Sequence, residues 1–407
     1  MHSRHFIFKL LLLGLVLIPW GCRRTEVQEP EPRTTTAEGG AILFEPAVAL
    51  IRDDETKSTL INSVNSGAHS NSFRVFCRRV GEGRHTLLFG NTGTQVTWNP
   101  SGTGTSKWEY TPLSYWYWIS LTNYYDFLAA MYPRPTGEEA MRMLDDLSGE
   151  EIPGNLAIKK AYALSDDYDL MMAGTRRTGA DTEKRSVKVP LTFQHMLCAV
   201  KVVVTNESAG ANLTLTSIKF DNIVQSAYAK VTIDALDQPE FSWIDTQRTN
   251  ADKSVFSGAQ ALPYGGGLAG TYNPASYDLL IPGDLSVAID GSLEPKVPQR
   301  EDYKKEADYN TAMAAYNTAL AAFEAKLPRL KITYTTPGEP PVEHNPAPIV
   351  LRNVKQARYG SAETIPEWEP GVKYTYNVSI RLDGGVLVTV ITSEWDEVIA
   401  ETPGILI

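Results

Sequence analysis

Residues 373–391, "KYTYNVSIRLDGGVLVTVI", decide the fold class of this chain. Apolar side chains alternate with polar ones without a break, at Tyr374, Tyr376, Val378, Ile380 and Leu382. Asp383-Gly384 is a favoured turn dipeptide, and "VLVTVI" then returns with a second apolar run. Alternation with a period of two is the pattern of a half-buried strand. The stretch therefore predicts a β-hairpin.

The same period occurs in the middle of the chain. In "VKVPLTF" (187–193), apolar residues share one face at Val187, Val189, Leu191 and Phe193, and "AVKVVVTN" (199–206) repeats the pattern. Gly, Pro, Asn and Asp clusters separate such runs along most of the sequence. This arrangement favours β-sandwiches over an α/β enzyme core.

One long helix interrupts the β pattern. Between 300 and 327, large apolar residues follow a 4-3-4-3-4 spacing at Tyr309, Met313, Tyr316, Leu320, Phe323 and Leu327, and Pro328 ends the run. This spacing predicts an amphipathic helical insertion over 300–327. Two interpretations stay open: the stripe packs on its own domain, or it binds a partner.

The first residues are typical of an export signal. A short basic segment precedes the apolar run "LLLLGLVLIPWGC", which is too short to span a bilayer. We expect residues 1–21 to be a lipoprotein signal peptide and Cys22 to be acylated. Residues 22–40 are rich in Pro, Glu and Thr and are expected to form a flexible tether.

The folded part is expected to form two domains, 41–180 and 181–407. The boundary is placed at "TRRTGADTEKR" (175–185), a polar, charged connection between strand-like runs. Beyond Cys22, the chain holds Cys77 and Cys198, each in an apolar segment. Two buried thiols are the simpler interpretation, and a bridge between them is the alternative.

Ten aromatic residues gather in the 25 residues from 108 to 132. Such rings can fill the core of a sheet domain or form a row on which sugars stack. The core interpretation is the one we favour.

Composition and motifs exclude several functions. The net charge of −10 is unsuitable for binding nucleic acid, whose phosphates require a basic surface. His69, His85, His195 and His344 have no His or Cys neighbour at metal-ligand spacing, and no G-x-S-x-G motif is present. We expect no catalytic site, no metal and no cofactor, and therefore no enzyme.

Several stretches, taken in order, resemble the fimbrillins, the Mfa-like pilins that build type V pili in Gram-negative anaerobes. They are "WEYTPLSYWYW", "YYDFLAAMYP", "YDLMMAG", "VPLTFQHMLCAVKVVV", "YDLLIP" and "EWEPGVKYTYNVSIRL", followed by "SEW". The resemblance implies an all-β fold of two tandem transthyretin-like β-sandwich domains with the helical insertion added. It also implies an outer-membrane lipoprotein at the cell surface, a fimbrial subunit that supports adhesion and associates with other pilus subunits.

The family assembles by adding a neighbour's strand to a sandwich that has lost one of its own. By that resemblance, the strand to be removed carries the plug residues Ile42, Phe44, Val48 and Leu50. The expected cut follows Arg52, with Lys57 and Arg33 as alternatives.

The donated strand is expected from the C-terminus, at Ile405, Leu406 and Ile407. Pro403 can donate no ladder hydrogen bond, so a tip subunit that only receives a strand stays an alternative to a stalk subunit. A different function class also stays open: a surface lipoprotein that does not polymerise and binds glycans through an aromatic face. The sequence does not identify the adhesion ligand.

Overall fold

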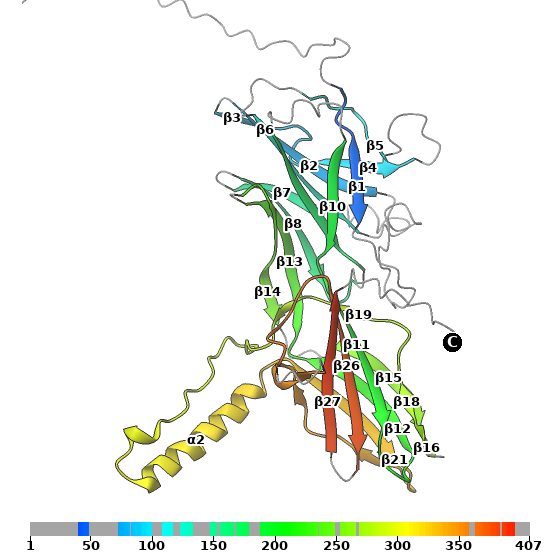
Figure 1. Cartoon of the computed structure of the whole chain (residues 1–407), viewed down its shortest axis with the longest axis vertical. Helices are drawn as coiled ribbons and strands as arrows, with labels where there is room; N and C mark the ends of the chain where they lie inside the picture. The colour runs from blue at the N-terminus through cyan, green and yellow to red at the C-terminus, as the bar shows by residue number, and fades with distance from the viewer. Residues whose placement is uncertain are drawn as a thin grey trace, which may run out of the picture. The chain divides into compact units, whose positions relative to one another are not determined.

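A computed structural model shows that the chain is mostly β-structure with one long helix among the described residues (Figure 1). The structure describes residues 40–48, 72–81, 83–99, 108–116, 123–132, 147–152, 155–166, 168–178, 188–234, 236–248, 253–265, 268–357, 363–382 and 385–394. The predicted all-β class with a helical insertion is confirmed. No helix in these ranges is long and apolar enough to cross a bilayer.

The largest described sheet has eight strands and contains the candidate site. Its strands, in spatial order, are β1 (Phe44–Val48), β10 (Val189–His195), β9 (Met171–Thr178), β6 (Tyr124–Met131), β2 (Ser72–Gly81), β4 (Thr94–Trp98) and β5 (Trp108–Glu109), and β3 (Arg84–Leu87) pairs with β2. β1 and β10 run parallel, whereas β10 with β9 and β9 with β6 are antiparallel.

A four-stranded sheet packs on this large sheet. Its strands are β14 (Pro239–Arg248), β13 (Val224–Ile233), β8 (Asn155–Ala163) and β7 (Leu147–Ile152), in that order. The β13–β8 pair joins residues from both sides of position 180 in one sheet. The expected division into domains 41–180 and 181–407, and the transthyretin-like type of the sandwiches, stay predictions.

The predicted C-terminal hairpin is confirmed as β26 (Val372–Arg381) and β27 (Gly385–Glu394). It belongs to a sheet with β18 (Thr271–Tyr272), β11 (Cys198–Asn206), β24 (Lys355–Gln356) and β19 (Asp278–Leu280). Four of the alternating residues are buried, while Leu382 lies beyond the end of β26 and is exposed. The alternating apolar side chains therefore face the core only within β26, which ends at Arg381.

The remaining elements complete this half of the structure. A further sheet is formed by β15 (Lys253–Leu262), β12 (Leu213–Asp221), β21 (Arg329–Thr336), β22 (Val342–His344) and β23 (Ile349–Val350). Two short pairs are β16 (Tyr264–Gly265) with β17 (Leu268–Ala269), and β20 (Gly283–Asp284) with β25 (Glu367–Trp368). The described helical elements are η2 (Arg300–Asp302), α2 (Glu306–Glu324) and η3 (Leu351–Asn353).

Both faces of the eight-stranded sheet are buried at its centre, as β6 illustrates. Tyr125 and Phe127 belong to one core cluster, which also contains residues of β1, β2 and β10. Leu128 points to the other face, into a second cluster shared with β8 and β13. A strand buried on both faces has a nearly continuous apolar sequence, which explains "FLAAM" in β6.

The helical insertion forms an arm, residues 286–327, in which an extended segment runs out and α2 returns (Figure 1). In the extended segment every third residue is half-buried, at Ile289, Ser292, Pro295 and Pro298. Three residues per turn is the period of a polyproline II helix. Gly291 lies in a turn at a φ of 70°, so this period applies to residues 292–298. The 19 residues of α2 span about 27 Å.

Contacts hold both ends of the arm. At its base, the Ile289 amide donates to the Lys326 carbonyl at 2.9 Å. Near its tip, the Arg300 guanidinium donates to Glu306 at 3.2 Å. Along α2, all of which the structure describes, Phe323 is buried and the rest of the apolar stripe is half-buried. The helix is shorter than the predicted 300–327, because Tyr303 and Lys305 have extended backbone angles before it and Ala325 is its C-cap.

The two cysteines of the folded part are buried free thiols, so the bridge interpretation is wrong. Cys77 lies in the core cluster next to β1, and Cys198 lies in the other large cluster. Burial raises the pKa of both thiols above the ordinary value.

Candidate functional site at strand β1

Strand β1 is the end strand of the eight-stranded sheet and bonds to two different segments. Residues 44–48 pair with 189–193 of β10 in parallel register. Before the strand, Ala41 forms an antiparallel bridge with Tyr115. The Ile42 amide donates to the Ser114 carbonyl at 2.9 Å, which reinforces the bridge. Residues 40–48 therefore close the space between β10 and the segment that follows β5.

The side chains of Ile42 and Phe44 fill a groove in the core. Both are 0% exposed. The Phe44 ring contacts four other rings, those of Phe73, Phe89, Tyr110 and Phe127, at centroid distances between 5.5 and 6.4 Å. Burial of a side chain of this size stabilises the folded state by about 1.5–3 kcal/mol. Ile42 and Phe44 therefore hold β1 and the residues just before it in place mainly through apolar contacts.

Tyr110 clamps the start of this strand. Its hydroxyl donates to the Ile42 carbonyl at 2.8 Å and accepts from the Ser114 amide at 3.2 Å. Burial of the phenol raises the pKa of Tyr110 to about 12. Because the neutral phenol is needed to donate, this clamp persists through the physiological pH range.

The backbone ladder that holds β1 is weaker than that of a central strand. Parallel pairing is slightly less stable per residue than antiparallel pairing. Pro46 lies in β1 and Pro190 lies opposite Glu45 in β10, and neither can donate a backbone hydrogen bond. β1 thus depends on its two buried side chains and on Tyr110 more than on its ladder.

Three of the predicted site residues lie in the described part of the chain. Ile42 and Phe44 are buried in the core, and Val48 ends β1 opposite Phe193, while their role as plugs of a removable strand stays a prediction. The other predicted residues lie outside the described residues: Leu50, Arg52 with its alternatives Lys57 and Arg33, Cys22, and the donor candidates Ile405, Leu406 and Ile407. Their roles stay predictions.

Most described rings of the aromatic segment are in the core. Buried residues include Trp108, Tyr110, Trp116, Tyr125 and Phe127. Tyr115 is the exception, at 59% exposure, because its backbone pairs with Ala41 at the surface. These buried rings lie in the same core cluster as Phe44, as the core interpretation predicted.

Sequence reasoning did not identify the groove lining or the Tyr110 clamp. The alternation in "SFRVFC" of β2 indicates that Phe73 faces inward, but no local pattern shows which distant strand it meets. Among the described residues, no group of three or more His, Cys, Asp or Glu side chains is placed to hold a metal ion. The expectation of no catalytic site stays a prediction.

Comparison with known proteins agrees with this architecture. The model of the fimbrillin-like family matches residues 68–262. This part of the chain is fimbrillin-like. The match supports the role of a fimbrial subunit. No curated protein matches the sequence.

Solved structures cover most of the chain at low identity. A protein assigned to cell adhesion from Bacteroides uniformis is 14% identical, with 87% of this chain and 99% of that chain covered and a TM-score of 0.38. One from Parabacteroides distasonis is 11% identical, with 87% and 96% covered and a TM-score of 0.39. The tip fimbrial protein Mfa3 from Porphyromonas gingivalis is 9% identical, with 88% and 100% covered and a TM-score of 0.31. Because these TM-scores are below 0.5, the functional proposal rests on the fimbrillin-like match and on the β1 groove.

Proposed function

We propose that this fimbrillin-like chain is a structural subunit of a cell-surface fimbria that polymerises by protease-triggered donor-strand exchange. It is exported as a lipoprotein acylated at Cys22 and is anchored in the outer membrane until assembly. Cleavage after Arg52 releases the β1 strand, and the segment at Ile405–Ile407 of a neighbouring subunit then fills the vacated groove.

One observation supports this proposal: β1 is an end strand, and the side chains of Phe44 in it and of Ile42 just before it are fully buried in the core cluster. Loss of the strand would expose apolar surface and the unpaired edge of β10, which is a template for an incoming strand. The prolines at 46 and 190 weaken the ladder that must be broken. A strand held mainly by side chains can be replaced by another strand with similar plugs.

The glycan-binding alternative receives less support. It requires an aromatic row at the surface, and most described rings of the segment are in the core, with Tyr115 as the strongly exposed one. A stalk, tip or accessory position in the fimbria is equally compatible with the groove.

The test is cleavage of the purified chain by a protease that cuts after basic residues. N-terminal sequencing locates the cut, and gel electrophoresis after mild heating in detergent reports multimers. We expect a new N-terminus at Asp53 and multimers that appear only after cleavage. The Arg52→Ala variant should not give the Asp53 N-terminus and should stay monomeric, while Arg33→Ala, a matched control in the tether, should behave as the unmodified chain. A chain that is cut after Arg52, has lost residues 40–48 and stays monomeric would contradict the proposal.

A further inference from the structure

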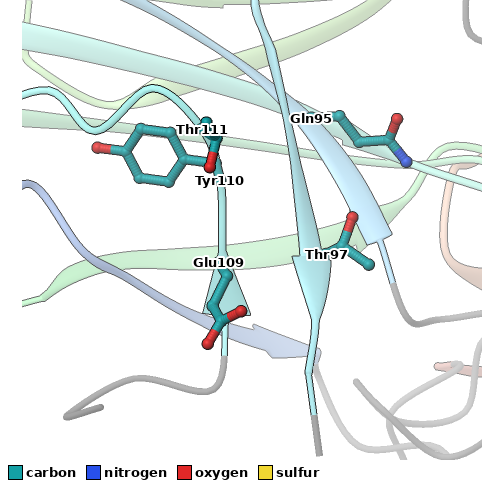
Figure 2. Close-up of a pocket in the computed structure, with 5 residues that line it drawn as sticks. All are labelled: Gln95, Thr97, Glu109, Tyr110 and Thr111. Atoms are coloured by element: carbon teal, nitrogen blue, oxygen red, sulfur yellow. The ribbon is translucent and has the colours of Figure 1, made fainter. Parts of the chain in front are cut away.

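A pocket of about 410 Å³ opens beside strands β4 and β5 and shares Tyr110 with the β1 groove. Figure 2 shows the residues that line it: Gln95 and Thr97 from β4, Glu109 from β5, and Tyr110 and Thr111 just after β5. None of these residues is a plug residue or a predicted cleavage or donor site.

Strand alternation explains why polar groups gather there. Thr97 pairs with Glu109 across the β4–β5 ladder, so these two side chains lie on the same face. Val96 and the Tyr110 ring lie on the other face, inside the core cluster. In Figure 2 the Tyr110 ring accordingly points away from the β4 side chains. The pocket is therefore the polar, outward side of a strand pair whose inner side supports the groove.

The lining has the chemistry of a site for neutral hydroxyl groups. Gln95 contributes an amide, and Thr97 and Thr111 contribute hydroxyls that can donate or accept. The Glu109 carboxylate accepts from the Asn99 amide at 2.8 Å, which fixes its orientation. A carboxylate that still has free acceptor positions binds the O–H groups of a sugar well, because hydrogen bonds to an ionised acceptor are the stronger ones.

The same lining argues against other ligand classes. No Lys or Arg is among the described residues that line the pocket, so this described lining offers no cation to an anion such as a phosphate, sulfate or sialic acid. A single carboxylate among neutral oxygens is a poor site for a divalent cation, which prefers several charged oxygen ligands. Neutral polar ligands are the class that remains.

We propose that this pocket binds a neutral saccharide of one or two rings, with Gln95, Thr97, Glu109 and Thr111 as its hydrogen-bonding residues. The assignment goes beyond the proposed function, because it concerns the uncut chain and requires neither β1 release nor polymerisation. It supplies a ligand class for the surface of the subunit.

The test is binding of the uncut chain to a panel of immobilised neutral saccharides, including lactose and N-acetylglucosamine, with sialyllactose as the anionic comparison. We expect weak binding to at least one neutral sugar and less to sialyllactose. Because each variant removes one hydrogen-bond partner of the sugar, Glu109→Gln and Thr97→Val should each weaken that binding roughly tenfold.

Matched controls come from another exposed strand. Glu240→Gln and Thr246→Val make the same chemical changes on β14 and should leave binding unchanged. Circular dichroism and a thermal melt confirm that each variant is folded. Absence of neutral-sugar binding, preference for the sialylated sugar, or undiminished binding in both pocket variants would each overturn the proposal. Because polymerisation is assayed separately on the cut chain, failure here leaves the strand-exchange proposal unaffected.

Discussion

Replacement of Phe44 by alanine should loosen β1 without unfolding the rest of the chain. Phe44 is fully buried against four rings, and a buried Phe→Ala change costs about 3–5 kcal/mol in transfer and cavity terms. The local opening of β1 should become easier by the same amount. Because about 1.4 kcal/mol corresponds to a factor of ten, a loss of 3 kcal/mol raises the open population roughly 100-fold.

The rate of labelling of Cys77 measures this opening, and the rate of labelling of Cys198 shows whether the rest of the chain stays folded. Cys77 shares a core cluster with Phe44, whereas Cys198 lies in the other cluster, where its thiol contacts the Leu280 carbonyl. Burial raises both pKa values, so neither thiol reacts while it is covered. At pH 8 in native buffer, Phe44→Ala should accelerate labelling of Cys77 roughly 100-fold and leave Cys198 protected.

Peptide mass spectrometry reads each cysteine separately. Glu45→Ala, an exposed change on the same strand, is the matched control and should label as the unmodified chain does. Equal acceleration at Cys77 and Cys198 would mean global unfolding, and unchanged labelling at Cys77 would mean that Phe44 does not hold β1. Either result would refute the account of the groove.

Three further predictions concern stability, measured by urea unfolding. Asp126 accepts from Arg78 at 2.8 Å in the core, so Asp126→Ala should cost about 3–5 kcal/mol, whereas Glu150→Ala, which breaks an exposed pair, should cost less than about 1 kcal/mol. Tyr110 has a raised pKa in the folded state, so its contribution to the free energy of unfolding is complete below pH 10 and is lost as the pH rises toward about 12. Tyr110→Phe should lower the free energy of unfolding by about 1 kcal/mol at pH 8, and the variant should not show this loss of stability at alkaline pH. The Asn222 side-chain amide donates to two carbonyls beyond the end of α2, and the backbone of Asn222 itself has a φ of 58°. Because glycine tolerates a positive φ better than alanine does, Asn222→Ala should destabilise the chain more than Asn222→Gly. Both variants should lower the helical signal in circular dichroism.

The elements that the sequence predicts well are those with a strong local period. The hairpin at 373–391 and the strand before His195 alternate clearly, and the structure has both. The pairing of β1 with β10 was not predictable, because a period of two shows which side chains face inward and not which distant strand they meet. The Tyr110 clamp depends on that pairing, so it could not be derived either.

For the helix, too, the local pattern predicts the element but not the segment that it meets. Its 4-3-4-3-4 spacing predicted a helix and an inward stripe, but its boundaries were too wide by several residues at each end. The segment that half-covers the stripe has a period of three, anchored at Pro295 and Pro298. A search for periods of two and 3.6 does not detect a polyproline II partner.

The arm has a modular length. Residues 309–315 and 316–322 of α2 read "YNTAMAA" and "YNTALAA", so the helical half is built from two nearly identical heptads. One heptad rises about 10.5 Å, and three residues of a polyproline II helix, which has the period of the facing segment, rise about 9.3 Å. Duplication of seven residues on one side and three on the other would extend the arm by about 10 Å and repeat the same contacts. Small in-frame duplications can therefore change the length of the arm in fixed steps. The sheets and the β1 groove would stay as they are.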